Sequence, residues 1–157
     1  MSDPITLDPL IFGPDQRCFG CGPSNEVGMQ LRFAREGDEV VTTFTARPGW
    51  EGPPGIVHGG LQSTLADEIG AWTLVGLRDC FGFTTTMNLR LYRPARTDTP
   101  IEARGRIAEE GEGTATVAVT LRQDGRRVLS GRITYAIPTL AQAEKMLGPD
   151  LPESWRR

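Results

Sequence analysis

The sequence predicts an α+β fold in which one long, mostly apolar helix is wrapped by a curved antiparallel sheet. Two observations lead to this prediction. A helical repeat of apolar residues runs from Gly59 to about Leu77. Alternating apolar and polar residues, the pattern of strands, occur twice before this segment and four times after it. An antiparallel sheet that must cover one buried helix curls around it, which gives a layered α+β arrangement.

The chain has the size and composition of one globular domain. It has 157 residues, enough for a single substantial core, so we expect one domain over residues 1–157. A hydrophobic share of 38% and a charged share of 24% argue against disorder. Residues 1–26 are rich in Gly, Pro and Asp and are expected to wrap the surface as an N-terminal extension. Residues 139–157 form a C-terminal tail, whose part 139–147 could form a short helix.

Six segments show the strand pattern. Residues 29–33 and 40–46 flank the turn Glu36-Gly37-Asp38, which predicts a hairpin. The other four segments are 87–91, 101–107, 115–121 and 129–137. The Gly-containing turns near residues 111–113 and 124–125 favour antiparallel neighbours. A six-strand sheet with one helix leaves a face and two edges without cover, and pairing with a second subunit is the usual remedy.

The predicted helix carries two acidic residues on an otherwise apolar or small surface. Asp67 and Glu68 are the only ionisable residues between Gly59 and Leu77. A carboxylate in such a place is costly unless it is paired or useful. Burial would raise the pKa of Asp67 and suit it to general-base work. Glu68 points about 100° away and is expected to be the more solvated of the two. A solvated or hydrogen-bonded structural aspartate is the alternative.

The start of this helix follows a glycine-rich loop, Gly55-Ile56-Val57-His58-Gly59-Gly60. The first N–H groups of a helix have no partner inside it, and the helix dipole reinforces them as donors. Such donors suit a carbonyl oxygen that gains negative charge during a reaction. A simple glycine-rich turn is the alternative. His58 is the only histidine, and fixing the loop by hydrogen bonding is favoured over a role as a base. Asp67 lies more than two turns farther along, so two antiparallel helices from two subunits could bring both groups to one atom more easily than one subunit could.

Cysteine and arginine provide two weaker signals. Cys18-Phe19-Gly20-Cys21 has the gap of a zinc or redox pair, but one pair is half a zinc site, so we expect a structural role and no metal. Cys80 stands alone. The series Arg90, Arg93 and Arg96 could meet the phosphates of a nucleotide, and an exposed strand edge is the alternative.

Charge and hydrophobicity exclude some classes of protein. The net charge of −3 disfavours a nucleic-acid partner. No apolar stretch approaches the length that spans a bilayer, and the N-terminus lacks the pattern of a signal peptide. The odd count of 3 cysteines then indicates reduced thiols in a cytoplasmic protein.

Three motifs resemble one known family. The first is Cys18-Phe19-Gly20-Cys21-Gly22-Pro23-Ser24-Asn25 followed by Gly28-Met29-Gln30-Leu31, which resembles the N-terminal signature of many PaaI-like thioesterases. The second is the loop 55–60 with Asp67 after it, which resembles that family's active-site motif. The third is the segment 84–94, which resembles the strand after the central helix. Over about residues 18–137, the chain thus resembles a PaaI-like acyl-CoA thioesterase.

The resemblance implies a hotdog fold and the hydrolysis of acyl-CoA thioesters to free acid and CoA, with no metal or redox cofactor. It also implies a homodimer with paired sheets, often doubled to a homotetramer, with two sites at the subunit interface. In these sites the Gly59 amide would polarise the thioester carbonyl. Asp67 of the neighbouring subunit would be the general base or the nucleophile. His58 would line the site, and Thr84 would help to hold the water.

Further substrate contacts are expected from basic and polar residues around the site. The expected substrate-binding residues are Gly60, Glu68, Asn88, Arg90, Arg93 and Arg96. One position departs from the family, because Gly52 stands where many relatives carry Asn or Gln. A non-catalytic acyl-CoA or small-ligand binding protein is therefore the alternative function. A hotdog dehydratase is disfavoured, because His58 has no aspartate close in sequence.

Overall fold

The computed structural model describes residues 3–152 and residue 155. Residues 1–2, 153–154 and 156–157 of the expected domain lie outside the described residues. The elements in chain order are β1 (Ile5–Thr6), β2 (Ala34–Glu36), β3 (Glu39–Phe44), α1 (Gly59–Arg78), β4 (Phe83–Leu91), β5 (Ile101–Gly111), β6 (Thr114–Gln123), β7 (Arg126–Ala136) and α2 (Leu140–Leu147).

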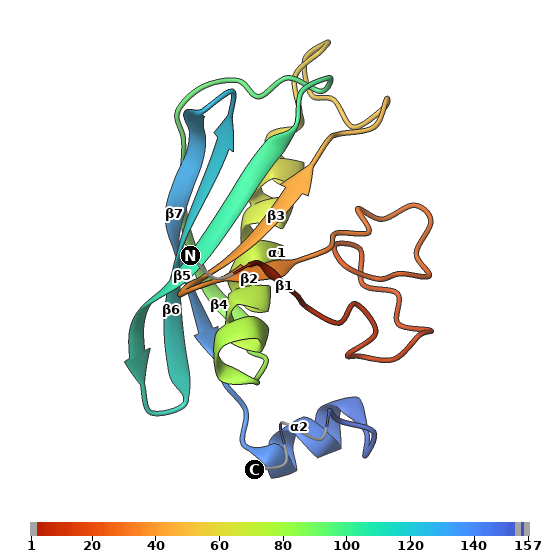
Figure 1. The fold of residues 1–157 in the computed structure, drawn as a ribbon, viewed down its shortest axis with the longest axis vertical. Helices are drawn as coiled ribbons and strands as arrows, with labels where there is room; N and C mark the ends of the chain where they lie inside the picture. Colours follow the sequence, from red (N-terminus) through yellow and green to blue (C-terminus); the bar gives the residue numbers. More distant parts are fainter. Residues whose placement is uncertain (1–2, 153–154, 156–157) are drawn as a thin grey trace.

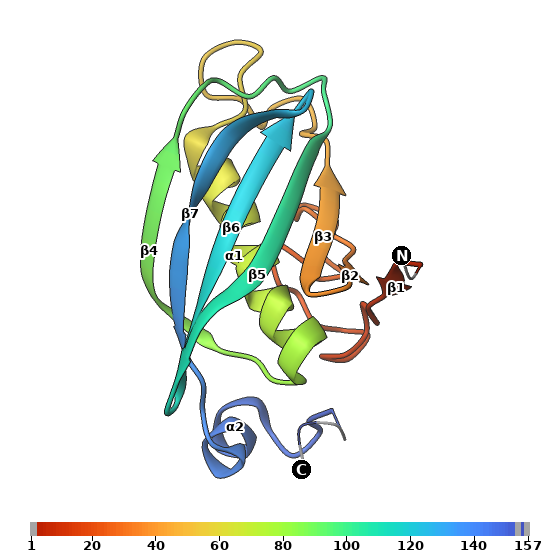
Figure 2. The same cartoon turned by 60° about the vertical axis from the view of Figure 1, so that its left-hand side comes forward.

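The strands form one sheet that curves around helix α1 (Figure 1). The sheet has 7 strands in the order β1-β2-β3-β5-β6-β7-β4. Every neighbouring pair is antiparallel. Figure 2 shows the four long strands β4 to β7 side by side, with α1 behind them and β4 at one edge. The α+β architecture of a central helix wrapped by a curved sheet is confirmed, and it is the hotdog fold.

Helix α1 has a cap at each end that explains its length. His58 is the N-cap, and its Nδ1 atom accepts a hydrogen bond from the Gly60 N–H at 2.9 Å. The helix ends at Arg78, and the C-cap residue Asp79 adopts the left-handed conformation with φ 50° and donates its N–H to the Val75 carbonyl at 3.2 Å. The predicted helix from Gly59 to about Leu77 is thus confirmed to within one residue.

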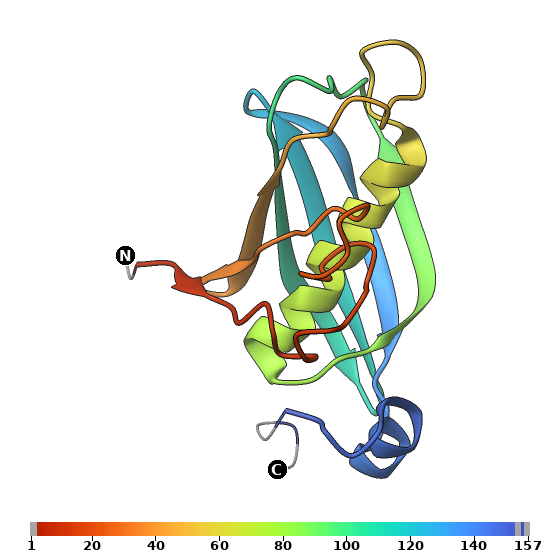
Figure 3. The same ribbon diagram turned by 90° about the vertical axis from the view of Figure 1, so that its right-hand side faces the viewer.

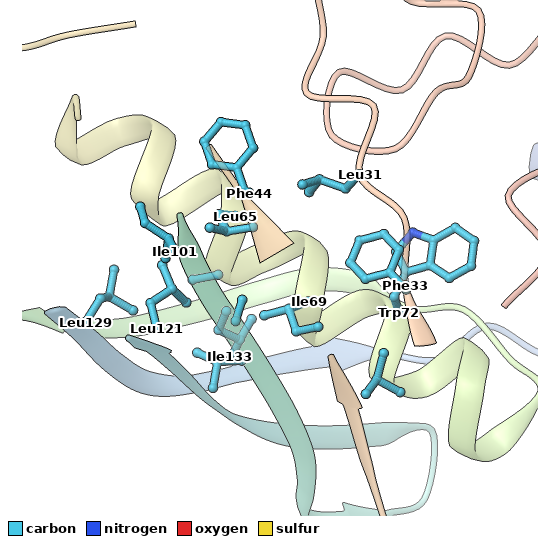
Figure 4. Close-up of a cluster of buried hydrophobic side chains, with 14 of the residues drawn as sticks. Leu31, Phe33, Phe44, Leu65, Ile69, Trp72, Ile101, Leu121, Leu129 and Ile133 are labelled. Atoms are coloured by element: carbon cyan, nitrogen blue, oxygen red, sulfur yellow. The ribbon is translucent and has the colours of Figure 1, made fainter. Parts of the chain in front are cut away.

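The core lies between α1 and the concave face of the sheet (Figure 4). Leu65 and Ile69 of α1 are fully buried against side chains from the long strands. The sheet residues of this cluster are Ile101, Leu121, Leu129 and Ile133. Toward the other side, Trp72 stacks on Phe33 with ring centroids 4.7 Å apart. Burial of each such side chain stabilises the fold by about 1.5–3 kcal/mol, which fixes α1 on the sheet.

The segment 29–33 is the main departure from the predicted strands. Met29, Leu31 and Phe33 are buried in alternation, as the pattern indicated, but β2 begins only at Ala34. The backbone of this segment pairs instead with the cysteine loop, through N–H bonds from Met29 to the Phe19 carbonyl at 2.7 Å and from Leu31 to the Gly20 carbonyl at 2.9 Å. Alternation reports one-sided burial, and here a loop supplies the hydrogen bonds that a strand would have supplied.

The remaining elements follow the predictions more closely. The hairpin around Gly37 is confirmed, with β2 and β3 closed by the pair Glu36 and Glu39. The short helix in the C-terminal tail is confirmed as α2, which begins at a capping box formed by Thr139 and Gln142. Strand β1, two residues long, was not predicted, because two residues carry no periodicity. Within the described ranges, neither α1 nor α2 combines the length and the hydrophobicity that crossing a membrane requires.

Candidate active site

The N-terminus of α1 presents one free backbone donor. The Gly60 N–H donates to His58 Nδ1 at 2.9 Å, which places the proton of a neutral His58 ring on Nε2. The N–H groups of Leu61 and Gln62 donate to the His58 carbonyl at 3.0 and 3.1 Å. In the described part of the chain, no group accepts a hydrogen bond from the Gly59 N–H. This amide, reinforced by the helix dipole, is therefore available to an acceptor outside the chain.

Asp67 lies in the middle of α1 with one carboxylate oxygen held in place. Thr84 Oγ1 donates to Asp67 Oδ1 at 2.7 Å. The hydroxyl of Tyr135 lies 3.2 Å from the same oxygen and 2.9 Å from the Asp67 carbonyl. The structure therefore brings together Asp67 and Thr84, which sequence reasoning had placed in one site. With Oδ1 occupied, Oδ2 is left to accept a proton from another molecule.

Tyr135 is a site residue that sequence reasoning missed. It is fully buried on β7, and burial together with the nearby Asp67 charge raises the pKa of its hydroxyl, which keeps it a hydrogen-bond donor. Gly70 of α1 makes room for it, because a Cβ atom at position 70 would lie 2.1 Å from the Tyr135 hydroxyl oxygen. A glycine in the middle of a helix, opposite an inward-facing tyrosine, was the available signal.

Glu68 does not share the site of its neighbour. Its Oε1 atom lies 3.3 Å from Cys18 Sγ, in the loop that crosses the outer side of α1. Burial is the main reason that the pKa of Glu68 is raised to about 8, and the adjacent Cys18 adds to it. Both carboxylates are half-buried, so Glu68 does not stand out as the more solvated of the two. Asp67 and Glu68 therefore lie on different sides of α1, with Asp67 in contact with β4 and Glu68 in contact with the cysteine loop.

Strand β4 runs past both parts of the candidate site, which are the helix start at Gly59 and the carboxylate of Asp67. Thr84, near its beginning, holds Asp67. Leu91, at its end, lies beside the helix start, because a Cβ atom at Gly59 would be 3.6 Å from Leu91 Cδ2. Gly59 and Asp67 are separated by eight helical residues, or about 12 Å along the axis. One substrate carbonyl therefore cannot contact both groups within one chain.

The outer edge of β4 is open and carries three large, exposed apolar side chains. β4 pairs with β7 on one side only and ends the sheet. Phe83, Met87 and Leu91 are 40%, 41% and 46% exposed along this strand. A free edge with large apolar side chains is the kind of surface that a second chain covers.

Two of the expected substrate-binding arginines, Arg90 and Arg96, lie in different surroundings. Arg90 and Arg127 both lie over the ring of Tyr92, at 5.2 and 4.3 Å from its centroid, near the Leu91 end of β4. Arg96 is held elsewhere, with ion pairs of 3.0 Å to Asp124 and 3.6 Å to Asp98. Arg90 thus lies beside Arg127, a basic residue that was not among the expected contacts, whereas Arg96 already has acidic partners.

The other expected contacts are solvent-accessible. Arg93 and Asn88 are exposed, with Asn88 on β4. Gly60 is exposed beside His58. Gly52 also borders the helix start, because a Cβ atom there would lie 3.6 Å from His58 Cα, which is ordinary contact. A side chain at position 52 would therefore reach this half of the site.

The comparison with family models bears on these residues. Residues 54–130 match the model described as the thioesterase superfamily. Over this segment, which is slightly less than half of the chain, the sequence is similar to the thioesterase superfamily. The matched segment contains the glycine-rich loop 55–60, all of α1 and all of β4, and so includes Gly59, Asp67 and Thr84. A search of curated proteins finds no match.

Solved structures agree with this placement at the level of the fold. A thioesterase superfamily protein is 24% identical, with a TM-score of 0.71 over 83% of this chain and 66% of that protein. A mutant thioesterase from Pseudomonas aeruginosa is 22% identical, with a TM-score of 0.65 over 73% of this chain and 87% of that one. A hypothetical thioesterase from Streptococcus pneumoniae, solved with coenzyme A, is 21% identical, with a TM-score of 0.63 over 68% of this chain and 87% of that one.

Proposed function

We propose that this protein is a PaaI-like member of the thioesterase superfamily and that it hydrolyses acyl-CoA thioesters to a free acid and CoA. The observation that supports this best is the pairing of a free Gly59 N–H at a helix start with a held Asp67 carboxylate. The first is suited to an oxygen that becomes negative, and the second to a proton that must be removed. The match of residues 54–130 to the thioesterase superfamily supports thioester hydrolysis as the reaction class.

In the proposed reaction the thioester carbonyl oxygen accepts a hydrogen bond from the Gly59 N–H. Asp67 Oδ2 takes a proton from a water molecule as that water attacks the carbonyl carbon. The negative charge on the resulting tetrahedral intermediate is stabilised by the Gly59 amide and the helix dipole. The intermediate then expels the CoA thiolate as the C–S bond breaks. The proton held on Asp67 returns to the thiolate, which leaves CoA and the free acid.

The proposed site is completed by a second copy of the chain. Two β4 edges that pair around a two-fold axis run antiparallel, because the symmetry reverses the strand direction. The Thr84 end of one β4 then lies beside the Leu91 end of the other. Since Thr84 holds Asp67 and Leu91 lies beside Gly59, each site takes Gly59 from one subunit and Asp67 from its partner. Doubling of the dimer to a tetramer stays a prediction.

Met87 is close to the centre of β4 and tests this dimer. We expect Met87→Lys to convert the protein to a monomer and to abolish turnover, because two like charges would meet near the two-fold axis. Sedimentation equilibrium and a thioesterase assay measure both effects. Met146→Lys is the matched control, since Met146 is also exposed, at 56%, but lies on α2. A dimeric and active Met87→Lys variant would contradict pairing through β4.

A coenzyme A ester is the proposed substrate class for two reasons. Arg90, Arg93 and Arg127 are exposed basic residues, and Arg90 and Arg127 converge on Tyr92 just after the end of β4, where they could meet the phosphates of CoA. One of the similar solved structures, from Streptococcus pneumoniae, was determined with coenzyme A.

Thiol release from a panel of short, medium, long and aryl acyl-CoAs tests the proposed function. We expect the wild type to hydrolyse at least one member of the panel, and we expect this turnover to be lost when Asp67 is replaced. Binding of CoA esters without any turnover would favour the alternative, a non-catalytic acyl-CoA binding protein. Position 52 would then be examined first, because it borders His58. Replacing Gly52 with Asn or Gln would supply the side chain that the resemblance to PaaI-like thioesterases leads one to expect there.

A further inference from the structure

The loop that contains Cys18 and Cys21 lies across α1 on the side away from the sheet (Figure 3). It brings both cysteines to Glu68, and the ligand atoms of all three residues lie within 4.8 Å of one another. Cys18 Sγ and Glu68 Oε1 are 3.3 Å apart. The proposed thioesterase mechanism uses none of these three groups.

Each of the two sulfur atoms accepts a hydrogen bond. Cys18 Sγ accepts the Cys21 N–H at 3.5 Å. Cys21 Sγ accepts a hydrogen bond from Gln16 Nε2 at 4.0 Å. Donors directed at sulfur stabilise thiolates, and such outer contacts are what orient and tune thiolate ligands of a metal.

The loop is shaped to let the carboxylate approach the sulfurs. A Cβ atom at Gly20 would lie 2.1 Å from Glu68 Cδ, so a side chain at this position would displace Glu68. A Cβ atom at Gly22 would lie 2.6 Å from the Cys18 carbonyl oxygen, which accepts the Gly22 N–H at 2.9 Å to close the turn. Glycine at both positions therefore keeps the three ligand groups together.

The clustering of three groups that can become negative favours the binding of a cation. Two thiols and a carboxyl, all able to become negative, share a partly buried space. Among the ion pairs of the described residues, none involves Glu68. Such groups must stay protonated, or they must share a positive charge. A divalent ion that prefers sulfur would satisfy all three at once.

We propose that Cys18, Cys21 and Glu68 form a Zn²⁺ site. Thiolates with a carboxylate are a ligand set that zinc accepts in tetrahedral geometry. The fourth position would face a pocket of about 230 Å³ that the three ligands share with apolar side chains such as Phe12, Trp72 and Phe81. Three protein ligands with one open position is the arrangement of zinc sites that bind a water molecule or an exchangeable ligand.

This proposal revises the sequence-based expectation that the chain has no metal site. Cys18 and Cys21 were counted as half a site because no second cysteine pair follows. The third ligand comes from α1, 50 positions beyond Cys18 in the sequence. Nothing in the local pattern of α1 distinguishes Glu68 as a partner of the cysteines, so only the folded structure shows it.

Cobalt binding to the full-length protein tests the proposal. The protein is reduced, treated with a chelator and titrated with Co²⁺, whose thiolate charge-transfer and d–d absorption report sulfur ligands and tetrahedral geometry. We expect one Co²⁺ per chain with both absorptions, displaced by one Zn²⁺. Cys18→Ser and Cys21→Ser are expected to weaken Zn²⁺ binding by more than the roughly 10–100-fold typical of outer contacts.

Two further variants separate metal binding from other effects. Glu68→Gln is expected to keep the thiolate absorption but to bind Zn²⁺ at least about tenfold more weakly, with an unchanged circular dichroism spectrum. Cys80→Ser is the matched control, because Cys80 lies outside the cluster and should leave binding unchanged. These readouts do not depend on thioesterase activity, so the proposed function can fail without affecting them.

Three results would overturn the proposal. The first is reduced wild-type protein that shows no thiolate absorption with Co²⁺. The second is equal Zn²⁺ affinity in the Cys80→Ser and Cys18→Ser variants. The third is a Cys18–Cys21 disulfide that opens with reductant in a protein that then takes up no Zn²⁺, which would identify the two residues as a redox pair instead.

Discussion

Asp67→Asn is expected to lower the turnover of acyl-CoA by roughly 10²–10⁴-fold, the range that a general base supplies. Asparagine has the size of aspartate, and its carbonyl oxygen can still accept the hydrogen bonds from Thr84 and Tyr135. The variant loses the basic oxygen and retains the local geometry. Steady-state thiol release gives the turnover number, and a thermal melt shows whether the fold is retained.

Asp79→Asn is the matched control for this substitution. Asp79 lies at the other end of α1, is exposed and adopts a left-handed conformation that asparagine also accepts. The control should keep wild-type turnover, because it makes the same chemical change outside the site. An Asp67→Asn variant with undiminished turnover would show that Asp67 is not the base. Glu68, which contacts Cys18 rather than Thr84, would then be tested next.

Periodicity predicted the elements that depend on one-sided burial. The apolar repeat of α1 and the alternation in the four long strands reflect contacts with a common core, and both appear in the structure. The same alternation at Met29, Leu31 and Phe33 gave burial correctly but not a strand. Hydrogen-bond partners are chosen by tertiary contacts, and a pattern of side chains cannot reveal that the cysteine loop supplies them.

Sequence reasoning predicted the site residues that lie in one continuous segment. It was much less successful for contacts between segments that are distant in the sequence. Gly59 and Asp67 lie in one motif on one helix, and Thr84 was assigned only through a family resemblance. Tyr135 reaches Asp67 from 68 residues away, and this contact requires the sheet to curl over α1. The environments of Asp67 and Glu68 depend on which side of the helix the N-terminal loop covers, and residues 1–26 have no periodicity that would fix its course.

Gly59→Pro is expected to lower turnover by about 10²–10³-fold, as the removal of one oxyanion donor does. Proline lacks the N–H that we assign to the carbonyl oxygen. Gly59 is the first residue of α1, where proline is well accepted, and His58 before it has φ −54° and ψ 132°, a conformation compatible with a following proline. The substitution therefore removes a donor with little cost to the helix.

Gly59→Ala separates the loss of the donor from the effect of added bulk. It keeps the N–H and adds a Cβ atom 3.6 Å from Leu91 Cδ2, which is ordinary contact. We expect its turnover to stay within a few-fold of the wild type, since an interaction that is kept should cost little. If the alanine and proline variants lose turnover equally, crowding near Leu91 explains the loss and the amide has no role.

A heterodimer of Asp67→Asn and Gly59→Pro subunits joins the two predictions. If each site takes Gly59 from one subunit and Asp67 from its partner, one of the two sites in this heterodimer has both intact residues. Heterodimers purified with two different affinity tags should then show about half of the wild-type turnover, although the turnover of each variant alone is at least about 100-fold lower than that of the wild type. If both residues acted within one chain, every site would carry a defect and mixing would restore nothing. Recovery of turnover would therefore establish the shared site, because substitution of either residue by itself cannot show which subunit supplies it.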